Sequence, residues 1–264
     1  MYNIKIFCSW DLKFNLFHEK QIELYIDSIP HDQPSENVIR FVFLLEPPEI
    51  VNLSNQAIVG LNNGTYHHLL THNQELIDLS PKAHLFEFGT TWIRNYEFPD
   101  KEFSISTLIG GKLMANGHYL RQEVLTNMNR IMGPKNFYVS GNFPPKIDVS
   151  NLKVLGDNKI PLFDSQFHIC IENTKRLNWF TEKLIDCMIT KTIPIYWGCP
   201  NIGNWFNLDG MIMVNNLEDI INVCNSLNEN TYNEKLNAIN ENYEIAKKLS
   251  TIDDRLINKI KELI

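Results

Sequence analysis

The sequence has no apolar stretch long enough to cross a bilayer, for which a helix needs about 20 residues. Its apolar runs are short, as in Val38–Leu45, and its first residues lack the basic and then apolar segments of a secretory signal. We therefore expect no transmembrane segment and a cytoplasmic location. The alternative is peripheral contact with a membrane through lysines near the C-terminus, which alternate with acidic residues.

Cysteine and positive charge are both scarce. The five cysteines are odd in number and scattered, without a C-x-x-C pair, which argues against a disulfide framework or a zinc site. Lysine and arginine number 24 against 31 aspartates and glutamates, which gives a net charge of −7. Nucleic acids carry charge of the same sign, so we expect no nucleic-acid partner.

No G-x-G-x-x-G pattern follows a predicted strand, which disfavours a dinucleotide-dependent oxidoreductase. What the chain does contain is typical of a folded soluble protein: 264 residues, of which 44% are hydrophobic and 21% charged. That length suits one large domain or two domains of about 130 residues each.

Strands and helices alternate along the chain. Val38–Leu45 is a nearly continuous apolar run, which is typical of a strand buried on both faces, and two prolines end it. The other predicted strands are Asn3–Cys8, His67–Thr71, His84–Phe88, Phe103–Ile109, Phe137–Ser140, Phe167–Ile171, Ile193–Trp197 and Met211–Val214. The predicted helices are Leu16–Ser28, Gln74–Leu79, His118–Met132, Thr181–Thr190, Leu217–Leu227 and Asn233–Ile264, the last broken near Thr251.

This alternation predicts an α/β protein with parallel sheets covered by helices. It occurs in two runs that join near residues 95–105, which indicates two Rossmann-like domains. Ligands of such sheets bind beyond the carboxyl ends of the strands, so we expect functional side chains directly after strands.

One segment, residues 167–201, combines these features with charged side chains. Its strand ends at Glu172-Asn173, and Thr181 then begins a helix whose first turn holds Glu182 and Lys183. A helix N-terminus and a lysine both favour an anion, and an adjacent carboxylate suits sugar hydroxyls, so the pattern predicts a nucleotide-diphosphate site. The alternative is that Glu182 only stabilises the first turn and Lys183 is solvated.

The same segment resembles the donor-binding region of the α-1,3/1,4-fucosyltransferases, glycosyltransferase family 10. That region has a strand ending in F-E-N-S, then an acidic-aromatic-x-T-E-K helix start, then a strand of the type V/I-P-I/V-x-x-G-x-P. The matching residues are Phe167, Glu172, Asn173, Asn178-Trp179-Phe180, Thr181, Glu182, Lys183, Ile193-Pro194-Ile195, Gly198 and Pro200. The departures are Asn178 for Asp, Trp179 for Tyr, Ile171 for Phe and Thr174 for Ser.

The resemblance implies the GT-B fold, in which two Rossmann-like domains turn their parallel sheets toward a central cleft. Residues 1–100 would bind the acceptor and residues 101–245 the nucleotide-sugar donor, and the helix 246–264 would pack back on the N-terminal domain. The donor-binding residues it implies are Arg121, Asn173, Trp179, Thr181, Glu182 and Lys183.

The resemblance also assigns roles to these residues. Arg121 and Lys183, with the helix start at Thr181, would hold the diphosphate; Glu182 and Asn173 would hold ribose or sugar hydroxyls; Trp179 would pack on the donor. For the arginine, Arg130 is the competing candidate.

In the N-terminal half, Glu46 stands where the family has its catalytic glutamate, just after a buried strand and before proline. Glu49 is a competing candidate, and the alternative for both is a solvated turn. His67, His68 and His72 are further candidates for shaping an acceptor pocket.

The implied function is an inverting transfer of L-fucose from GDP-fucose to a hydroxyl of an acceptor glycan. No D-x-D motif occurs, so we expect no metal site and no obligatory metal, although Mn²⁺ or Mg²⁺ could stimulate by relieving product inhibition. The alternatives are a GT-B transferase with another nucleotide-sugar donor, and a non-catalytic nucleotide- or carbohydrate-binding module. The oligomeric state is not predicted.

Overall fold

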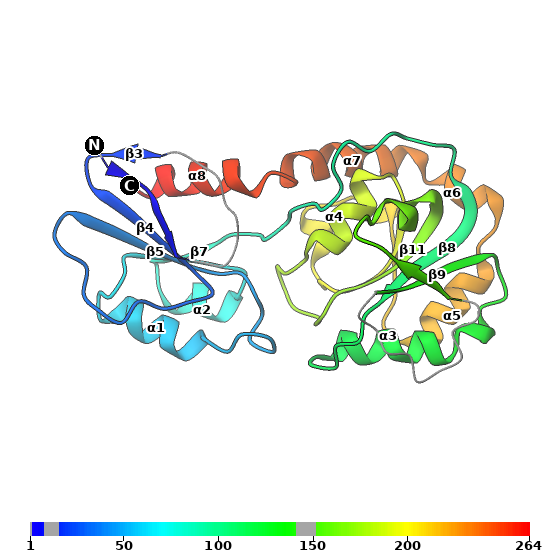
Figure 1. Cartoon of the computed structure of the whole chain (residues 1–264), viewed down its shortest axis with the longest axis horizontal. Helices are drawn as coiled ribbons and strands as arrows, with labels where there is room; N and C mark the ends of the chain where they lie inside the picture. The colour runs from blue at the N-terminus through cyan, green and yellow to red at the C-terminus, as the bar shows by residue number, and fades with distance from the viewer. Residues whose placement is uncertain (1, 8–15, 141–151) are drawn as a thin grey trace. The chain divides into compact units, whose positions relative to one another are not determined.

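A computed structural model of the chain describes residues 2–7, 16–140 and 152–264, and their contacts divide into two compact units. Unit 1 contains the chain up to Phe88 together with Leu177–Trp179 and Thr251–Ile264. Unit 2 contains Gly89–Arg176 and Phe180–Ser250. Each unit is built around its own parallel sheet covered by helices (Figure 1), which confirms the predicted α/β class.

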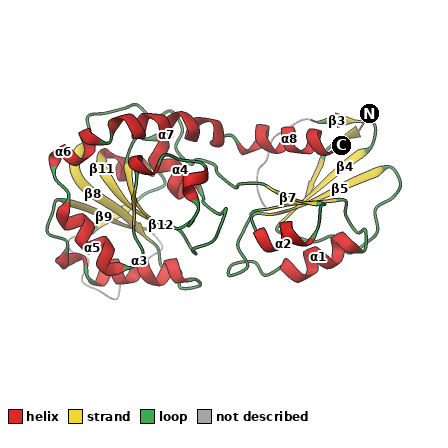
Figure 2. Cartoon of the chain, turned by 180° about the vertical axis from the view of Figure 1, so that it is seen from behind, coloured by secondary structure: helices red, strands yellow, loops and turns green. Residues whose placement is uncertain are grey.

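Unit 1 has a five-stranded parallel sheet in the order β2-β4-β5-β6-β7, with helices on both of its faces (Figure 2). Its strands are β2 Lys5–Phe7, β4 Gln21–Ile26, β5 Val38–Leu44, β6 His68–Thr71 and β7 Ala83–Leu85, beside an antiparallel pair, β1 Tyr2–Asn3 and β3 Phe17–His18. Its helices are α1 Ser54–Asn62, α2 Gln74–Leu79 and α8 Ile252–Leu263.

The strand predicted at Val38–Leu45 is confirmed as β5, at the centre of this sheet. Phe41 and Phe43 pack toward α8, while Val42 and Leu44 pack toward α1 and α2, so the four positions from 41 to 44 all need apolar side chains.

The helix predicted at Leu16–Ser28 is wrong, because this segment contains β4. Ile22, Leu24 and Ile26 lie in the same apolar cluster as the inner face of α8, whereas Tyr25 packs on the opposite face. The pattern therefore has a period of two residues, which is the period of a strand and not that of a helix. Between them, Glu23 is tolerated because it forms a buried ion pair with Arg40, 2.7 Å from Nε to Oε2.

Unit 2 has a six-stranded parallel sheet in the order β10-β9-β8-β11-β12-β13. Its strands are β8 Glu102–Ile109, β9 Lys135–Ser140, β10 Lys153–Leu155, β11 Ser165–Ile171, β12 Ile193–Trp197 and β13 Ile212–Met213. Its helices are α3 Asn116–Thr126, α4 Glu182–Ile189, α5 Leu217–Ser226, α6 Glu229–Glu234 and α7 Leu236–Leu249, with short 3₁₀ turns at Met128–Arg130, Ile160–Asp164, Ile202–Asn204 and Leu208–Gly210.

Helices cover both faces of this sheet (Figures 1 and 2), and their side chains form two apolar clusters. Leu184 and Met188 of α4 belong to one cluster together with the end of α7, and Val124 of α3 and Ile220 of α5 belong to the other. The strands predicted from Phe103 to Trp197 are confirmed, whereas α1 and β10 are elements that the sequence pattern did not predict. Helix α1 lacks a sequence signal because Leu53 stands at its N-cap and offers no side-chain cap.

The two units divide at different residues from those predicted. Unit 2 begins at Gly89 rather than 101, because Asp186 Oδ1 accepts hydrogen bonds from Thr91 Oγ1 (2.7 Å) and from the Trp92 N–H (2.8 Å). The C-terminal break predicted near Thr251 is confirmed, and the residues from Thr251 onward belong to unit 1. Over the described ranges, no helix is both long enough and apolar enough to span a membrane.

Candidate functional site

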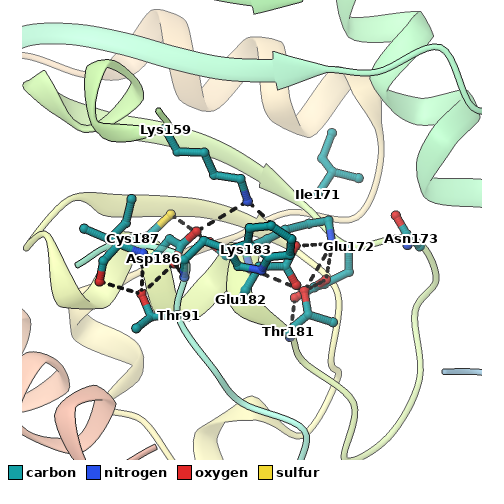
Figure 3. Close-up of polar contacts among 12 residues, drawn as sticks. Thr91, Lys159, Ile171, Glu172, Asn173, Thr181, Glu182, Lys183, Asp186 and Cys187 are labelled. Atoms are coloured by element: carbon teal, nitrogen blue, oxygen red, sulfur yellow. Dashed lines mark hydrogen bonds and ion pairs between the residues drawn. The ribbon is translucent and has the colours of Figure 1, made fainter. Parts of the chain in front are cut away.

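The carboxyl end of β11 carries Glu172, a fully buried carboxylate (Figure 3). Its Oε1 accepts a hydrogen bond from the Thr181 N–H at 2.8 Å, and its Oε2 accepts one from the Thr181 hydroxyl at 2.7 Å. Burial raises the pKa of Glu172, against the opposing effects of Lys183 and of the Thr181 bonds. Glu172 therefore ties the end of β11 to the start of α4.

Two glycines, Gly117 and Gly198, allow the backbone to pack closely against Glu172. A Cβ at Gly117, in the first turn of α3, would overlap the backbone oxygen of Glu172. A Cβ at Gly198, just after β12, would lie 2.6 Å from Glu172 Cγ. The Gly117 N–H also donates to the Asn173 carbonyl at 2.9 Å. Helix α3 can therefore approach the end of β11 only with glycine at position 117.

Lys183, in the first turn of α4, lies among acceptor oxygens (Figure 3). Its Nζ is 3.1 Å from Glu182 Oε1, 3.2 Å from Thr181 Oγ1 and 3.8 Å from Glu172 Oε2. Burial lowers the pKa of Lys183, but Glu182 and Glu172 outweigh it, so the net shift is upward and Lys183 is a cation. Although burial favours the neutral acid, Lys183 and Lys159 lower the pKa of Glu182 to about 2.

The start of α4 differs in one respect from the sequence prediction of an open anion site. The Thr181 N–H is bonded to Glu172, and the Lys183 N–H is bonded to Thr181 Oγ1 at 3.3 Å. These two donors are therefore used within the protein. The positive charge available at this helix end comes from the Lys183 side chain.

Arg121 of α3 is buried against the end of β11. Its Nε and Nη2 donate to the Ile171 carbonyl at 3.1 and 2.6 Å, and Nη2 also donates to Asn173 Oδ1 at 2.9 Å. Within the described part of the chain, no carboxylate lies within ion-pair distance of its guanidinium. A buried arginine remains charged and needs an anionic partner, so this position favours binding of an anion.

The competing arginine, Arg130, is placed differently. It lies in the exposed turn Met128–Arg130 and forms a two-point ion pair with Glu218, with N–O distances of 2.8 and 2.7 Å. Arg121 and Lys183 are the two cations that the fold brings to the end of β11, where the charge of Arg121 acts to lower the pKa of Lys183.

Trp179, predicted to pack on the donor, contacts residues of unit 1 in this structure. Its side chain is buried, its Nε1–H donates to the Leu45 carbonyl at 3.2 Å, and its ring centre is 6.1 Å from that of His72. The preceding residue, Asn178, has a left-handed φ of 60° and donates from Nδ2 to Gln74 Oε1 at 2.9 Å. This turn directs Trp179 into unit 1.

Lys159 and Asp186 belong to the same charged group but were not predicted. Lys159 Nζ is 3.5 Å from Asp186 Oδ2 and 3.9 Å from Glu182 Oε1 (Figure 3). Burial raises the pKa of Asp186 to about 6, although Lys159 and the bond from Thr91 oppose the shift. Lys159 lies in a loop-rich region, where no periodic pattern could have indicated it.

Unit 1 contains a separate pocket of about 940 Å³ at the carboxyl ends of β2, β4 and β5. Glu46, directly after β5, lines this pocket, whereas the exposed Glu49 does not. One wall is formed by Phe7 and Tyr25, whose rings stack at 4.4 Å with an interplanar angle of 10°. The remaining lining residues are Ile26, Asp27, Ser28, Ile29, Pro30, His31, Asp32, Ile50 and Val51.

The three candidate histidines lie outside this pocket. His67 Nδ1 accepts from the Arg40 N–H at 3.0 Å, His68 Nδ1 lies 3.2 Å from His84 Nε2, and His72 packs near Trp179. Across residues 2–7, 16–140 and 152–264, no group of three or more His, Cys, Asp and Glu side chains is arranged to hold a metal ion.

Comparison with known proteins gives a partial sequence match and several fold matches. No model of a known protein family matches the chain. The chain is 39% identical over 54 residues to the α-(1,3)-fucosyltransferase FucT of Helicobacter pylori. This match covers 20% of the chain and 11% of the length of that enzyme.

Solved structures show the fold. A crystal structure of an α1,3-fucosyltransferase with GDP-fucose matches with a TM-score of 0.50 and 14% identity, over 90% of this chain and 79% of that one. A glycosyltransferase from Rickettsia africae matches with a TM-score of 0.57 and 12% identity, over 92% of this chain and 75% of that one. The fold is that of the GT-B glycosyltransferases, and the resemblance to the family 10 fucosyltransferases is confirmed.

Proposed function

We propose that this protein is a glycosyltransferase that transfers L-fucose from GDP-fucose to a hydroxyl of an acceptor glycan with inversion at the anomeric carbon. The proposal is supported by the GT-B fold and by the 39% identity to a fucosyltransferase over 54 residues. The observation that carries it is that two cationic side chains, Arg121 and Lys183, lie at the carboxyl end of β11. Arg121 brings a buried guanidinium without an ion-pair partner among the described residues, and Lys183 brings an ammonium group.

In this reaction the donor diphosphate gains negative charge as its bond to the sugar breaks. Arg121 and Lys183 are held in place by the Ile171 carbonyl and by Glu182, so they stabilise this charge without having to reorganise. Preorganised groups of this kind contribute roughly 3–4 kcal/mol each to transition-state stabilisation. Thr181 fixes the helix start that carries Lys183.

Asn173 and Glu182 are the proposed partners of ribose or fucose hydroxyls. Asn173 Oδ1 already accepts from Arg121, which leaves its amide N–H groups as hydrogen-bond donors. Glu182 is kept ionised by Lys183 and Lys159, so its carboxylate is an acceptor at neutral pH. Trp179, predicted to pack on the donor, is instead proposed to act within unit 1.

The pocket of unit 1 is the proposed acceptor site. The stacked Phe7 and Tyr25 rings offer a flat apolar wall for a sugar ring, and Glu46 lines the same pocket. Glu46 takes the proton from the attacking hydroxyl as general base. Attack from the face opposite the diphosphate then inverts the anomeric configuration.

We propose that no metal is obligatory, with Mn²⁺ or Mg²⁺ at most stimulating turnover, because Arg121 and Lys183 supply the positive charge that a metal would otherwise bring to the diphosphate. The cytoplasmic location stays a prediction from the scattered cysteines.

A thermal-shift series tests the donor assignment. GDP, UDP and CMP and the corresponding sugar nucleotides are added to the wild type and to Lys183→Ala. A ligand at 100 times its dissociation constant adds about 2.7 kcal/mol of stability. We expect GDP and GDP-fucose to stabilise the wild type and to lose this effect in Lys183→Ala. If only UDP or CMP species stabilise the protein, the assignment of GDP-fucose as the donor is wrong. If no nucleotide stabilises it, the proposal that the protein is a glycosyltransferase is refuted.

A further inference from the structure

The peptide that leads into Glu46 is held by side chains from two distant parts of the sequence. Asp27 Oδ1 accepts hydrogen bonds from the N–H groups of both Leu45 (2.8 Å) and Glu46 (3.1 Å). On the other side, Trp179 Nε1–H donates to the Leu45 carbonyl at 3.2 Å. All three bonds lie within unit 1.

Asp27 is the first residue after β4, and its side chain accepts backbone hydrogen bonds where the pairing of β4 with β5 ends. Strands β4 and β5 are paired from Gln21–Val38 to Ile26–Phe43, and the Asp27 N–H still donates to the Phe43 carbonyl at 2.9 Å. The chain of β4 then turns away, because Asp27 has a left-handed φ of 47°. Its carboxylate thus accepts hydrogen bonds from the N–H groups of the first two residues after β5. Burial raises the pKa of Asp27, and the two N–H bonds oppose that shift.

Trp179 supplies the other half of this support. Its side chain is 1% exposed, and the Leu45 side chain beside it is 3% exposed, so the bond between Nε1 and the Leu45 carbonyl is shielded from water. A buried indole N–H needs an acceptor, and here the acceptor is the backbone directly before Glu46.

The backbone after Glu46 is restricted as well. Pro47 follows it, and a residue before proline is held in the extended region. Asp27 and Trp179 fix the peptide before Glu46, and Pro47 limits the rotation after it. The backbone of Glu46, which lines the pocket, is therefore restrained on both sides, and with it the direction of the Cα–Cβ bond.

We propose that Asp27 and Trp179 are positioning residues for the general base, which hold the Leu45–Glu46 peptide so that the Glu46 carboxylate stays directed into the acceptor pocket. The proposal rests on the proposed function, since it needs Glu46 to act as the base. A displacement of about 1 Å can cost on the order of 100-fold in rate, so two such bonds are sufficient to matter for turnover.

The test uses variants that separate the carboxylate from the backbone conformation. Asp27→Gly removes the carboxylate but permits the positive φ, and Asp27→Asn keeps both an acceptor oxygen and a residue that tolerates this φ. Trp179→Phe removes the N–H donor and keeps an aromatic ring. We expect Asp27→Gly to lower kcat on the order of 100-fold with the KM for GDP-fucose within about twofold of wild type. Asp27→Asn should restore most of kcat, and Trp179→Phe should lower it less than Asp27→Gly.

A double-mutant cycle with Glu46→Gln distinguishes positioning from a general loss of structure. If Asp27 acts through Glu46, Asp27→Gly should cause no further loss of kcat once Glu46 is Gln. Independent, multiplied losses would overturn the proposal, as would an unchanged kcat in Asp27→Gly. If near-UV circular dichroism shows that Asp27→Gly does not fold, the double-mutant cycle is repeated with Trp179→Phe in its place. That cycle then decides between positioning and a general loss of structure. An unchanged kcat in Glu46→Gln alone would instead refute the proposed base.

Discussion

The two candidate sites of this protein are held in place in different ways. In unit 2 polar and charged side chains hold one another: Glu172 accepts a hydrogen bond from the Thr181 hydroxyl, and Glu182 forms an ion pair with Lys183. In unit 1 the side chains hold the backbone beside Glu46, and Glu46 faces an open pocket. A site that binds a fixed, highly charged diphosphate benefits from a rigid ionic network. A site that admits acceptor sugars needs space, so its rigidity comes from the chain behind it.

This comparison predicts that the largest loss of rate comes from unit 1 without any loss of donor binding. Replacing Glu46 by Gln removes the proton acceptor, and general-base catalysis contributes typically 10²–10⁴-fold. We expect kcat to fall by about that factor while GDP still raises the melting temperature as in wild type. Steady-state kinetics with thermal shift measures both. Glu49→Gln, at an exposed position outside the pocket, is the control and should keep wild-type kcat.

Unit 2 should show the opposite behaviour, with donor binding and rate lost together. Lys183→Ala removes the ammonium group at the start of α4, and the loss of one preorganised charge costs about 10²–10³-fold in rate. We expect kcat/KM for GDP-fucose to fall by about this factor and GDP to stop stabilising the protein. The control is Arg130→Ala, because Arg130 pairs with Glu218 on the surface of the same unit. Equal losses in both variants would mean a general effect of removing positive charge.

The close approach of α3 to β11 predicts that, in unit 2, stability and donor binding are lost together. Gly117→Ala places a methyl group against the Glu172 backbone oxygen, which should move α3 and with it Arg121. Overpacking of this kind costs typically 1–3 kcal/mol, so we expect the unfolding free energy to fall by about that amount and GDP affinity to fall with it. Denaturant unfolding and calorimetry are the measurements. Gly156→Ala is the matched control, because nothing lies within 4 Å of the position that its methyl group would take.

The buried Asp186 makes the stability of unit 2 depend on pH. Its pKa of about 6 lies above the ordinary 3.8, so its contribution to stability is complete below pH about 3.8 and is lost as the pH rises through about 6. Asp186→Asn keeps an acceptor for Thr91 and Trp92 without the charge. The stability of this variant relative to wild type should rise between pH 4 and pH 7 by about 2–3 kcal/mol. Urea unfolding at pH 4, 5, 6 and 7 measures the difference, and a difference that does not change with pH would contradict the assignment.

The smallest effect is expected from metal removal. If Arg121 and Lys183 neutralise the diphosphate, the chelator EDTA should leave the initial rate within about twofold of the untreated enzyme. Adding Mg²⁺ after product has accumulated should act only by relieving inhibition. A loss of the initial rate that Mn²⁺ or Mg²⁺ restores would show that the cations of unit 2 are not sufficient.

The two units also differ in how many of their site residues could be predicted from the sequence. In unit 2 all proposed donor-site residues except Arg121 lie in one segment: Phe167 to Pro200 contains the strand, the helix start and most of the charges, so one motif indicates them together. Lys159 and Asp186 escaped prediction, because the first lies in a loop and the second reads as one more polar position on an amphipathic helix.

In unit 1 the site is assembled from short, separate pieces. Glu46 could be predicted, since a buried strand and a proline mark its place. The role of Asp27 could not, because the apolar spacing of residues 16–28 is also compatible with a helix, and only the pairing of β4 with β5 brings Asp27 beside Glu46. Trp179 was predicted as a donor contact because it lies in the donor motif, but the left-handed turn at Asn178 directs it into unit 1.

The central claim is that unit 1 supplies the base and unit 2 the donor site for transfer of fucose to a glycan. The most direct measurement is the release of GDP from GDP-fucose over a panel of acceptor glycans, for wild type and Glu46→Gln. We expect at least one glycan to accelerate GDP release by the wild type and none to do so for Glu46→Gln, with the donor bound in both. GDP release that no glycan accelerates, or that is the same in both proteins, would contradict the account.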